Sequence, residues 1–323
     1  MAIKDSPKNG APERPVALIA GPTASSKSAV AVELAKAIEA KGGKAVIINA
    51  DSAQVYSDLS VLSARPSEDE MGGIEHRLFG AWDGAKACSA ARWAEAAREE
   101  IVQCHEAGAV PILVGGTGMY MKVLLEGIAP IPEIEPEIRE VVRAMSVETA
   151  YETLMIEDPE RATMLEPGDS QRIARALEVK RSTGVTLGDW QMAKTGGIGD
   201  EIALFPLLLL PPREWLYERC DRRFERMLDG GATDEVEALL ARKLDPDLPV
   251  MRAIGVPEIT ALLAEEASRE ETVDAGAQAT RNYAKRQYTW FRRQTDADWP
   301  RILEPVESNN IDLDTYFASL LLD

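Results

Sequence analysis

Residues 15–28 read PVALIAGPTASSKS, an apolar run followed by a loop of small and polar residues. The apolar part is typical of a buried parallel strand, and Gly21 follows it directly. A phosphate-binding loop has the pattern G-x-x-x-x-G-K-[ST] between a strand and a helix, where backbone N–H groups cradle phosphate. Gly21, Lys27 and Ser28 match it, whereas Ser26 replaces the second glycine. The predicted phosphate loop, a diphosphate-binding site, comprises Gly21, Pro22, Thr23, Ala24, Ser25, Ser26, Lys27 and Ser28.

Within the phosphate loop, Lys27 would neutralise the charge of the diphosphate, and the Ser28 hydroxyl would contact Mg²⁺. If the backbone at Ser26 must be left-handed, the Cβ atom there costs about 1–2 kcal/mol. The alternative is a glycine-poor turn from strand to helix that binds no ligand.

Strand-like and helical segments alternate on both sides of this loop. This alternation predicts a parallel sheet with right-handed crossovers. Together with the loop, it indicates an α/β fold: a P-loop NTPase-like parallel sheet flanked by helices. The expected strands are 15–20, 44–50, 109–114 and 202–210. Helices are expected at 27–41 and 90–107, and the pattern is helical throughout 212–293.

Between two of these strands the pattern is helical, and we predict a helical insertion domain at 127–199. It begins among prolines and ends among glycines, which is typical of hinge-like ends. The predicted core is 14–126 with 200–295. Residues 1–13 are expected to be a disordered leader, and 296–323 a C-terminal tail.

Composition narrows the possible functions. The chain has 323 residues and a net charge of −18, which excludes a generic basic coat for nucleic acid and a polybasic membrane binder, but not a local basic groove. The three cysteines, Cys88, Cys104 and Cys220, suggest neither a disulfide framework nor a zinc site, so a reducing cytoplasm is expected. No long apolar run predicts a membrane-spanning helix.

Two further motifs begin where predicted strands end. Asp51 follows the strand at 44–50, and its carboxylate could hold Mg²⁺, act as a general base, or cap a helix. Gly115-Gly116-Thr117-Gly118 follows the strand at 109–114 and on its own could be only a tight turn. Since ligands of parallel sheets bind beyond the carboxyl ends of the strands, we expect these motifs and the phosphate loop to converge.

An arginine stripe marks a second candidate anion site. Arg219, Arg222, Arg223 and Arg226 fall on one face of a predicted helix. A salt-bridged surface explains the stripe equally well, because Glu218 and Asp229 are suitably spaced partners.

Near the C-terminus, residues 281–294 mix basic and aromatic side chains and contain no acidic residue. This mixture suits single-stranded RNA, because bases stack on rings and phosphates meet cations. The alternative is an amphipathic helix whose aromatic residues belong to the core, which we favour for Trp290 and Phe291. In the insertion, Arg172 and Arg175 share one face of a predicted helix. This face could contact RNA phosphates, or it could be an ordinary solvent-exposed helix surface.

In order along the chain, GPTASSKS, DSAQVY, PILVGGTGMY, LLEGIAPIPEI, DSQRIARALEV, MRAIG and TRNYAKRQYTWFR resemble the bacterial tRNA dimethylallyltransferases, also called tRNA isopentenyltransferases. The resemblance covers residues 15–294. It implies transfer of the dimethylallyl group of dimethylallyl diphosphate to N6 of the adenosine 3′ of the anticodon, position 37, with release of diphosphate and help from Mg²⁺. It also implies that the phosphate loop holds an isoprenoid diphosphate and not ATP.

The resemblance further implies roles for single residues. Asp51 would be the general base, Thr117 would contact the reacting nucleotide, and Arg223 would bind the diphosphate; these three are the expected catalytic residues. The implied tRNA-binding residues are Asp51, Ser52, Ala53, Gln54, Thr117, Arg139, Gln171, Arg172, Ile173, Ala174, Arg175 and Arg252.

Two other functions are compatible with the sequence. A P-loop small-molecule kinase would bind ATP and turn it over without RNA. A catalytically impaired tRNA-binding relative would follow from Ser26 and from Ser57, which stands where the family usually has Arg or Lys. For the enzyme we expect a cytoplasmic monomer that binds no membrane.

Overall fold

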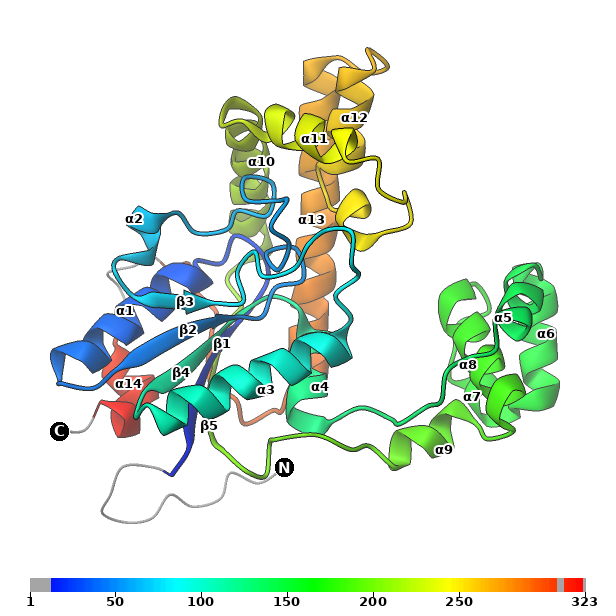
Figure 1. Ribbon diagram of the computed structural model, residues 1–323, viewed down its shortest axis with the longest axis horizontal. Helices are drawn as coiled ribbons and strands as arrows, with labels where there is room; N and C mark the ends of the chain where they lie inside the picture. The colour runs from blue at the N-terminus through cyan, green and yellow to red at the C-terminus, as the bar shows by residue number, and fades with distance from the viewer. Residues whose placement is uncertain (1–12, 307–310, 322–323) are drawn as a thin grey trace. The chain divides into compact units, whose positions relative to one another are not determined.

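The computed structural model describes residues 13–306 and 311–321. Nearly all of the predicted leader, residues 1–13, therefore lies outside the described residues. Within the described part the chain forms two compact units. The insertion unit is Leu125–Ile198, and the core unit consists of the described residues up to Leu124 and from Gly199 onward (Figure 1).

The core unit is built on a six-stranded sheet. Its strands are β1 (Pro15–Ala20), β2 (Ala45–Asn49), β3 (Glu75–Arg77), β4 (Val110–Gly115), β5 (Ala203–Leu209) and β6 (Arg301–Ile302). The order is β3-β2-β4-β1-β5-β6, and all neighbouring strands run parallel. In β1, Ala17 is level with Ile112 of β4 and Phe205 of β5. Because β1 is covered on both faces, its sequence is a continuous apolar run. The predicted α/β fold with a parallel sheet is confirmed.

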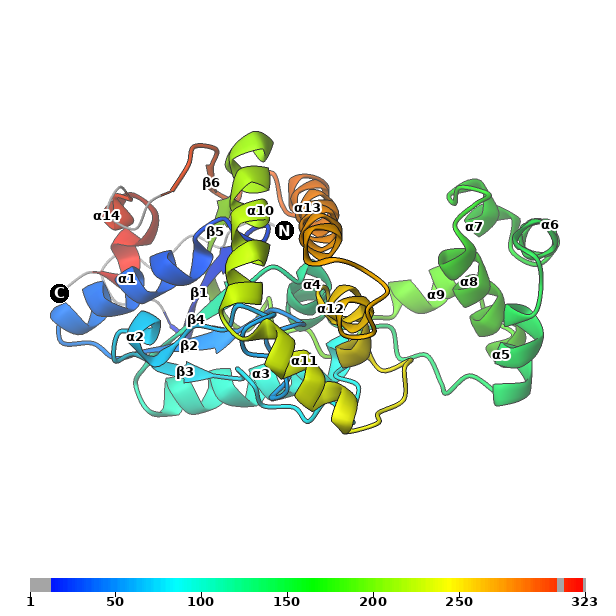
Figure 2. The ribbon, with the colours of Figure 1, turned by 90° about the horizontal axis from the view of Figure 1, so that it is seen from above.

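Helices cover both faces of the sheet. Helix α1 (Lys27–Ala40) packs Val30 and Leu34 onto one face, together with the C-terminal helix α14 (Leu313–Phe317). Helix α3 (Ala90–Glu106) lies on the opposite side, as Figure 2 shows. The indole N–H of Trp93 on α3 donates to the carbonyl of Asn49, so α3 is fixed to the end of β2.

Two parts of the sheet region differ from the prediction. Strand β3 reads Glu-His-Arg and has no apolar run, because it is a short edge strand that pairs only with β2. His76 lies in this strand. The segment from 296 was expected to be a tail, but it contains β6 and α14, and Phe317 is fully buried against the core.

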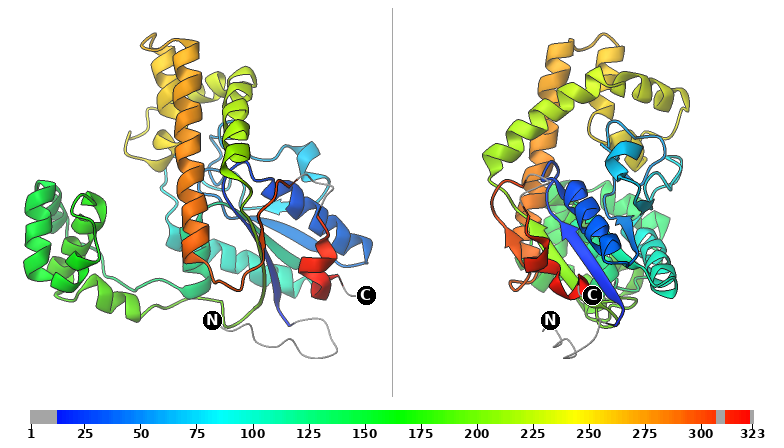
Figure 3. Two further views of the ribbon diagram at one scale, coloured as in Figure 1. Left: turned by 180° about the vertical axis from the view of Figure 1, so that it is seen from behind. Right: turned by 90° about the vertical axis from the view of Figure 1, so that its left-hand side faces the viewer.

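Beyond β5, helices rise from the edge of the sheet where the strands end (Figure 3). They are α10 (Arg213–Asp229), α11 (Ala232–Ala241), α12 (Val256–Leu263) and α13 (Arg269–Gln294). Helices α10 and α13 lie side by side. A Cβ atom on Gly276 of α13 would lie 2.0 Å from the ring of Phe224, so glycine permits this close packing. The short elements of the core unit are α2 (Glu68–Met71), α4 (Gly118–Glu126, which ends just inside the insertion unit), and the 3-10 turns η1 (Pro249–Arg252) and η2 (Ala318–Leu320).

The insertion unit has its own core. Its helices are α5 (Pro136–Arg143), α6 (Val147–Glu157), α7 (Pro159–Thr163), α8 (Ser170–Thr183) and α9 (Leu187–Met192). Leu154, Ile173 and Leu177 are fully buried between them. The two ends of the unit are joined by an antiparallel bridge between Ile128 and Thr195. Across the described residues of both units, no helix has the length and apolar character needed to cross a membrane.

Candidate active site

The ends of β1, β2 and β4 meet at one edge of the sheet. The Ala50 N–H donates to the carbonyl of Val114 at 2.7 Å, and the Thr117 N–H donates to the carbonyl of Ala50 at 3.2 Å. A Cβ atom on Gly115 would lie 2.2 Å from the backbone of Ala50, so a glycine allows the two loops to touch. The three motifs that follow these strands therefore share one site, because adjacent parallel strands end at the same edge.

The phosphate loop has an unusual backbone for a loop with so little glycine. Ala24 and Ser26 both lie in the left-handed region, with φ values of 63° and 68°. Ser26 immediately precedes α1, and the residues of the first turn of α1 line a pocket. Since the first N–H groups of a helix have no partner within the helix, they are available to an anion in that pocket.

We expect Ser26→Gly to raise the free energy of unfolding by about 0.5–1 kcal/mol, because glycine adopts a left-handed backbone without strain. Affinity for inorganic pyrophosphate should stay within about twofold, since the Ser26 hydroxyl faces Arg219, whose terminal nitrogen is 3.4 Å away. Urea unfolding and calorimetric titration measure both quantities. Ala24→Gly is the matched control, because it relieves the same strain without removing a hydroxyl. A much tighter pyrophosphate complex for Ser26→Gly alone would mean that this side chain impairs the loop.

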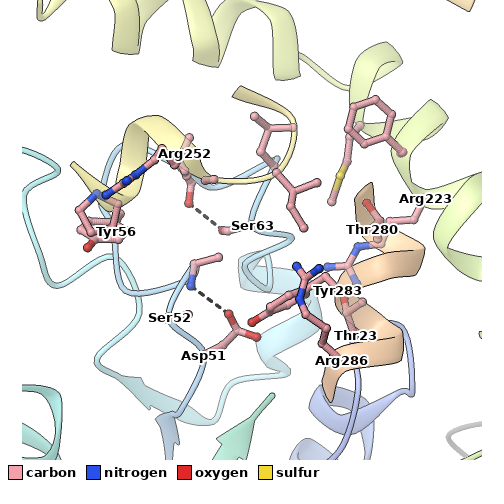
Figure 4. Close-up of a pocket in the computed structure, with 18 of the residues that line it drawn as sticks. Thr23, Asp51, Ser52, Tyr56, Ser63, Arg223, Arg252, Thr280, Tyr283 and Arg286 are labelled. Atoms are coloured by element: carbon pink, nitrogen blue, oxygen red, sulfur yellow. Dashed lines mark hydrogen bonds between the residues drawn. The ribbon is translucent and has the colours of Figure 1, made fainter. Parts of the chain in front are cut away.

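Asp51 lies where two pockets meet. The diphosphate pocket is lined by the phosphate loop from Thr23, the start of α1, and Arg219, Arg223 and Arg226 of α10. The aromatic pocket has apolar and aromatic walls, including Leu59, Phe224 and Tyr283 (Figure 4). Thr23, Asp51 and Arg223 line both pockets, so the carboxylate of Asp51 faces the anion site and the apolar space together.

The local backbone explains how Asp51 is held. Its carboxylate accepts the N–H of Ala53 at 3.0 Å, and its own N–H donates to the side chain of Asn49 at 2.9 Å. The chain after Asp51 forms turns and no helix starts there, so the helix-cap alternative is wrong. The hydroxyl of Thr117 accepts the N–H of Ser52 at 2.9 Å and donates to the Ser52 hydroxyl at 3.1 Å.

Positive charges face Asp51 from two elements. Burial lowers the pKa of Lys27 to about 8; the nearby Asp51 carboxylate partly offsets this effect, and Arg223 adds to it. Burial likewise lowers the pKa of Arg223, again opposed by Asp51. The Lys27 ammonium donates to the carbonyl of Pro22 at 2.6 Å. Two cations close to one another and partly desolvated make a site whose charge is best balanced by an anion.

The arginine stripe contacts the phosphate loop. Arg223 donates to the Thr23 hydroxyl at 3.3 Å, and Arg219 donates to the carbonyl of Ala24 at 2.8 Å while lying over the ring of Trp215. Arg222 and Arg226 donate to carbonyls of their own helix. Within the described residues, no ion pair joins Arg222, Arg223 or Arg226 to Glu218 or Asp229; Asp229 pairs instead with Arg269. These contacts favour the anion-site interpretation over a salt-bridged surface.

Residues of α13 from the basic and aromatic segment 281–294 complete the site. Tyr283 and Arg286 line the aromatic pocket, and the Arg286 guanidinium lies 5.7 Å from the centre of the Tyr283 ring. Burial raises the pKa of Tyr283 to about 12, and hydrogen bonds with Thr117 and Ser52 partly oppose the rise. Phe291 is fully buried and Trp290 packs on Gly118, as the core interpretation of these two residues expects.

Glu235 on α11 is a residue of the site that the sequence did not reveal. Its carboxylate accepts the N–H groups of Ser60, Val61 and Leu62. Leu59, Leu62 and Ser63 of the same loop line the aromatic pocket, so Glu235 holds one wall of that pocket in place.

The other predicted residues are more dispersed. Arg252 lines the aromatic pocket. Gln54 lines the diphosphate pocket and donates to the carbonyls of Ser63 and Ala64. Ser57 is exposed and its hydroxyl donates to the carbonyl of Trp82.

Residues Arg139 and 171–175 belong to the insertion unit. Arg139 is exposed on α5, and Arg172 and Arg175 pair with Asp169 and Glu178. Ile173 is fully buried in the core of the unit, so any contact that it makes with RNA must come from its backbone.

The central strand β1 leads through the phosphate loop into α1, and the carboxylate of Asp51 follows β2, which is separated from β1 by β4. This arrangement places the protein in the P-loop class. The family model described as IPP transferase matches residues 54–294. The chain belongs to this family, which confirms the predicted resemblance.

Several relatives are similar over nearly their whole length. The tRNA dimethylallyltransferase of Erythrobacter litoralis is 64% identical over 297 residues, covering 92% of this chain and 94% of the relative. That of Zymomonas mobilis is 52% identical over 312 residues, covering 97% of each. Among solved structures, the tRNA isopentenylpyrophosphate transferase of Bacillus halodurans has a TM-score of 0.65 at 29% identity, covering 95% of this chain and 94% of that one. A eukaryotic dimethylallyltransferase acting on tRNA has a TM-score of 0.78 at 25% identity, covering 94% of this chain and 76% of that one.

Proposed function

We propose that the protein transfers the dimethylallyl group of dimethylallyl diphosphate to N6 of adenosine 37 in tRNA and releases diphosphate. The observation that carries the proposal is the position of Asp51 between an anion-binding loop and an apolar, aromatic pocket. Family membership and the names of the relatives support it. A kinase would also use the phosphate loop, but phosphoryl transfer does not require the apolar pocket beside Asp51.

The diphosphate is expected to bind between Lys27, Arg223 and the backbone N–H groups of the phosphate loop. These groups are already held in place, Lys27 by the carbonyl of Pro22 and Arg223 by the hydroxyl of Thr23. Cations and N–H groups fixed in advance stabilise charge where it develops, without the cost of reorganisation. The dimethylallyl group would extend into the apolar part of the aromatic pocket.

The reaction is a substitution at the first carbon of the dimethylallyl group. The bond from this carbon to the diphosphate oxygen breaks, and the electron pair leaves with the diphosphate. The lone pair of N6 forms the new bond to the same carbon, and Asp51 takes the proton that N6 loses. A positioned carboxylate matters because the adenine amine is a weak nucleophile whose lone pair is delocalised into the ring.

We also propose that the site binds Mg²⁺. The Ser28 hydroxyl lines the diphosphate pocket together with Lys27 and Asp51. No group of three or more His, Cys, Asp or Glu side chains that could hold a metal occurs among the described residues. Mg²⁺ commonly uses few protein ligands and completes its shell with substrate phosphates and water, so Ser28 and the diphosphate would suffice. When bound, the ion would neutralise part of the charge on the leaving group.

The adenosine would leave its stack in the anticodon loop to reach Asp51, which costs a few kcal/mol and less in a loop than in a duplex. We propose that Thr117 and residues 51–54 contact this part of the tRNA, and that Arg252, Arg139 and residues 171–175 contact other parts. A cytoplasmic location and a monomeric state stay predictions.

We expect affinity for dimethylallyl diphosphate, measured without tRNA, to fall about tenfold between pH 7 and pH 9. The pKa of Lys27 is lowered to about 8 in the free protein, and an adjacent diphosphate raises it again. Binding above pH 8 must therefore take up a proton, so higher pH weakens binding. Calorimetry at pH 8 in buffers of different ionisation enthalpy should detect this proton. Lys27→Met should bind weakly with no such pH dependence, and an unchanged slope in that variant would assign the proton to another group.

The proposed function is tested by incubating the protein with dimethylallyl diphosphate, Mg²⁺ and unmodified tRNA, followed by mass analysis of the tRNA nucleosides. We expect an adenosine that has gained one dimethylallyl group, at position 37 only. ATP turnover without RNA and no modified adenosine would favour a kinase. Binding of tRNA without any product would indicate a catalytically impaired relative.

A further inference from the structure

Gln287 is a buried polar side chain on α13 that bridges two loops of the active site. Its carbonyl oxygen accepts the N–H of Thr23 in the phosphate loop at 2.7 Å, and its Nε2 donates to the carbonyl of Gly116 at 2.9 Å. Only 5% of the residue is exposed. We propose that Gln287 is a positioning residue that fixes the phosphate loop against the turn carrying Thr117. This inference rests on the proposed function, since it concerns the alignment of the two substrates.

The chemistry of the side chain fits this role. A glutamine amide offers an acceptor and a donor on one planar group, and the two partners are a backbone donor and a backbone acceptor. Thr23 also links Gln287 to the diphosphate site, because the hydroxyl of Thr23 accepts a hydrogen bond from Arg223. Without Gln287, the Thr23 N–H and the Gly116 carbonyl would lose their partners inside the protein.

The glycines after β4 leave room for this bridge. A Cβ atom on Gly116 would lie 2.2 Å from Nε2 of Gln287, and one on Gly118 would lie 2.2 Å from the ring of Trp290. Neither glycine has a positive φ, so these positions need space and not a special backbone. The run Gly115-Gly116-Thr117-Gly118 is thus built for close contact with β2 and α13.

The bridge belongs to one face of α13. Tyr283 lies one turn before Gln287 and contacts Ser52 and Thr117, and Trp290 lies one turn after it on Gly118. Residues at this spacing lie on the same face of a helix. A single rigid helix therefore contacts the loops after β1, β2 and β4, and Gln287 is its contact to the phosphate loop.

Two substitutions separate positioning from simple packing. Gln287→Met keeps the approximate volume but offers neither hydrogen bond. Gln287→Glu keeps the shape, and when protonated it offers an acceptor to Thr23 and a donor to Gly116. Gln278→Glu, on the exposed side of α13, is the matched control.

We expect Gln287→Met to lower kcat/KM for transfer by about tenfold to a hundredfold, because small displacements of reacting groups have effects of that size. Affinity for inorganic pyrophosphate should fall as well, while tRNA affinity stays within about twofold. The activity of Gln287→Glu relative to wild type should decline as pH rises, as the buried carboxyl ionises and faces the Gly116 carbonyl; burial raises the pKa of such a group above its ordinary value. Gln278→Glu should show no such decline.

Wild-type transfer kinetics and wild-type pyrophosphate affinity in Gln287→Met would overturn the inference. If Gln287→Met loses tRNA binding and thermal stability together with activity, the loss reflects general unfolding, and Gln287→Glu decides under conditions where it remains folded. No decline in the relative activity of Gln287→Glu as pH rises would then overturn the inference. If wild-type protein binds pyrophosphate but modifies no tRNA, the proposed function fails, and the pyrophosphate affinities of the variants still test the bridge.

Discussion

Replacing Asp51 with asparagine is expected to lower kcat for dimethylallyl transfer by about 10²–10⁴-fold, the usual contribution of a positioned general base. Asparagine has the same shape, and its side-chain oxygen can still accept the N–H of Ala53, the bond that orients Asp51. It cannot take the proton from N6 at neutral pH. The tRNA affinity should therefore stay within about twofold, because the loop keeps its conformation. Single-turnover measurements with dimethylallyl diphosphate and tRNA separate the chemical step from binding.

The control for charge is Asp274→Asn, which removes an exposed carboxylate from α13, away from both pockets. It should leave kcat within about twofold, since exposed charges are well screened. Asp51→Asn with normal kcat would remove Asp51 as the base. A loss confined to tRNA binding would give it a recognition role instead.

The main strands could be predicted because they are buried on both faces. β1, β2, β4 and β5 are mostly apolar runs, and parallel geometry then brings the three motifs after β1, β2 and β4 to one edge. β3 could not be found in this way, because Glu75-His76-Arg77 forms a strand only by pairing with β2. α14 was missed because its buried Phe317 follows a short, mostly polar stretch.

The supporting residues of the site could not be predicted from local patterns. The bond from Thr23 to Gln287 joins positions 264 apart, and that from Ser60 to Glu235 joins positions 175 apart. Such contacts leave no trace in the spacing of residues near either partner. The arginine stripe was ambiguous for the same reason, because its pattern on α10 does not show that the phosphate loop lies beside it.

Arg223→Gln is expected to lower kcat by about 10²–10³-fold, the typical effect of removing one preorganised group that stabilises developing charge. Arg223 lines both pockets and donates to Thr23 of the phosphate loop, so it lies where the leaving diphosphate gathers negative charge. Burial lowers its pKa and the Asp51 carboxylate opposes that effect, so an incoming diphosphate would further favour the charged guanidinium. Rapid-quench kinetics at saturating tRNA measure the chemical step, and product inhibition by pyrophosphate measures binding.

Two comparisons make the Arg223 prediction specific. Arg222→Gln removes the neighbouring charge, but Arg222 is exposed and donates to the carbonyl of Glu218 on its own helix, so kcat should change by about twofold at most. Arg223→Lys keeps the charge but loses the planar fork of donors, so it should recover only part of the rate. Equal losses of kcat for Arg222→Gln and Arg223→Gln would mean that the arginine stripe acts only through the combined electrostatic field of its charges. A selective loss at Arg223, partly restored by lysine, would place the guanidinium directly against the departing diphosphate.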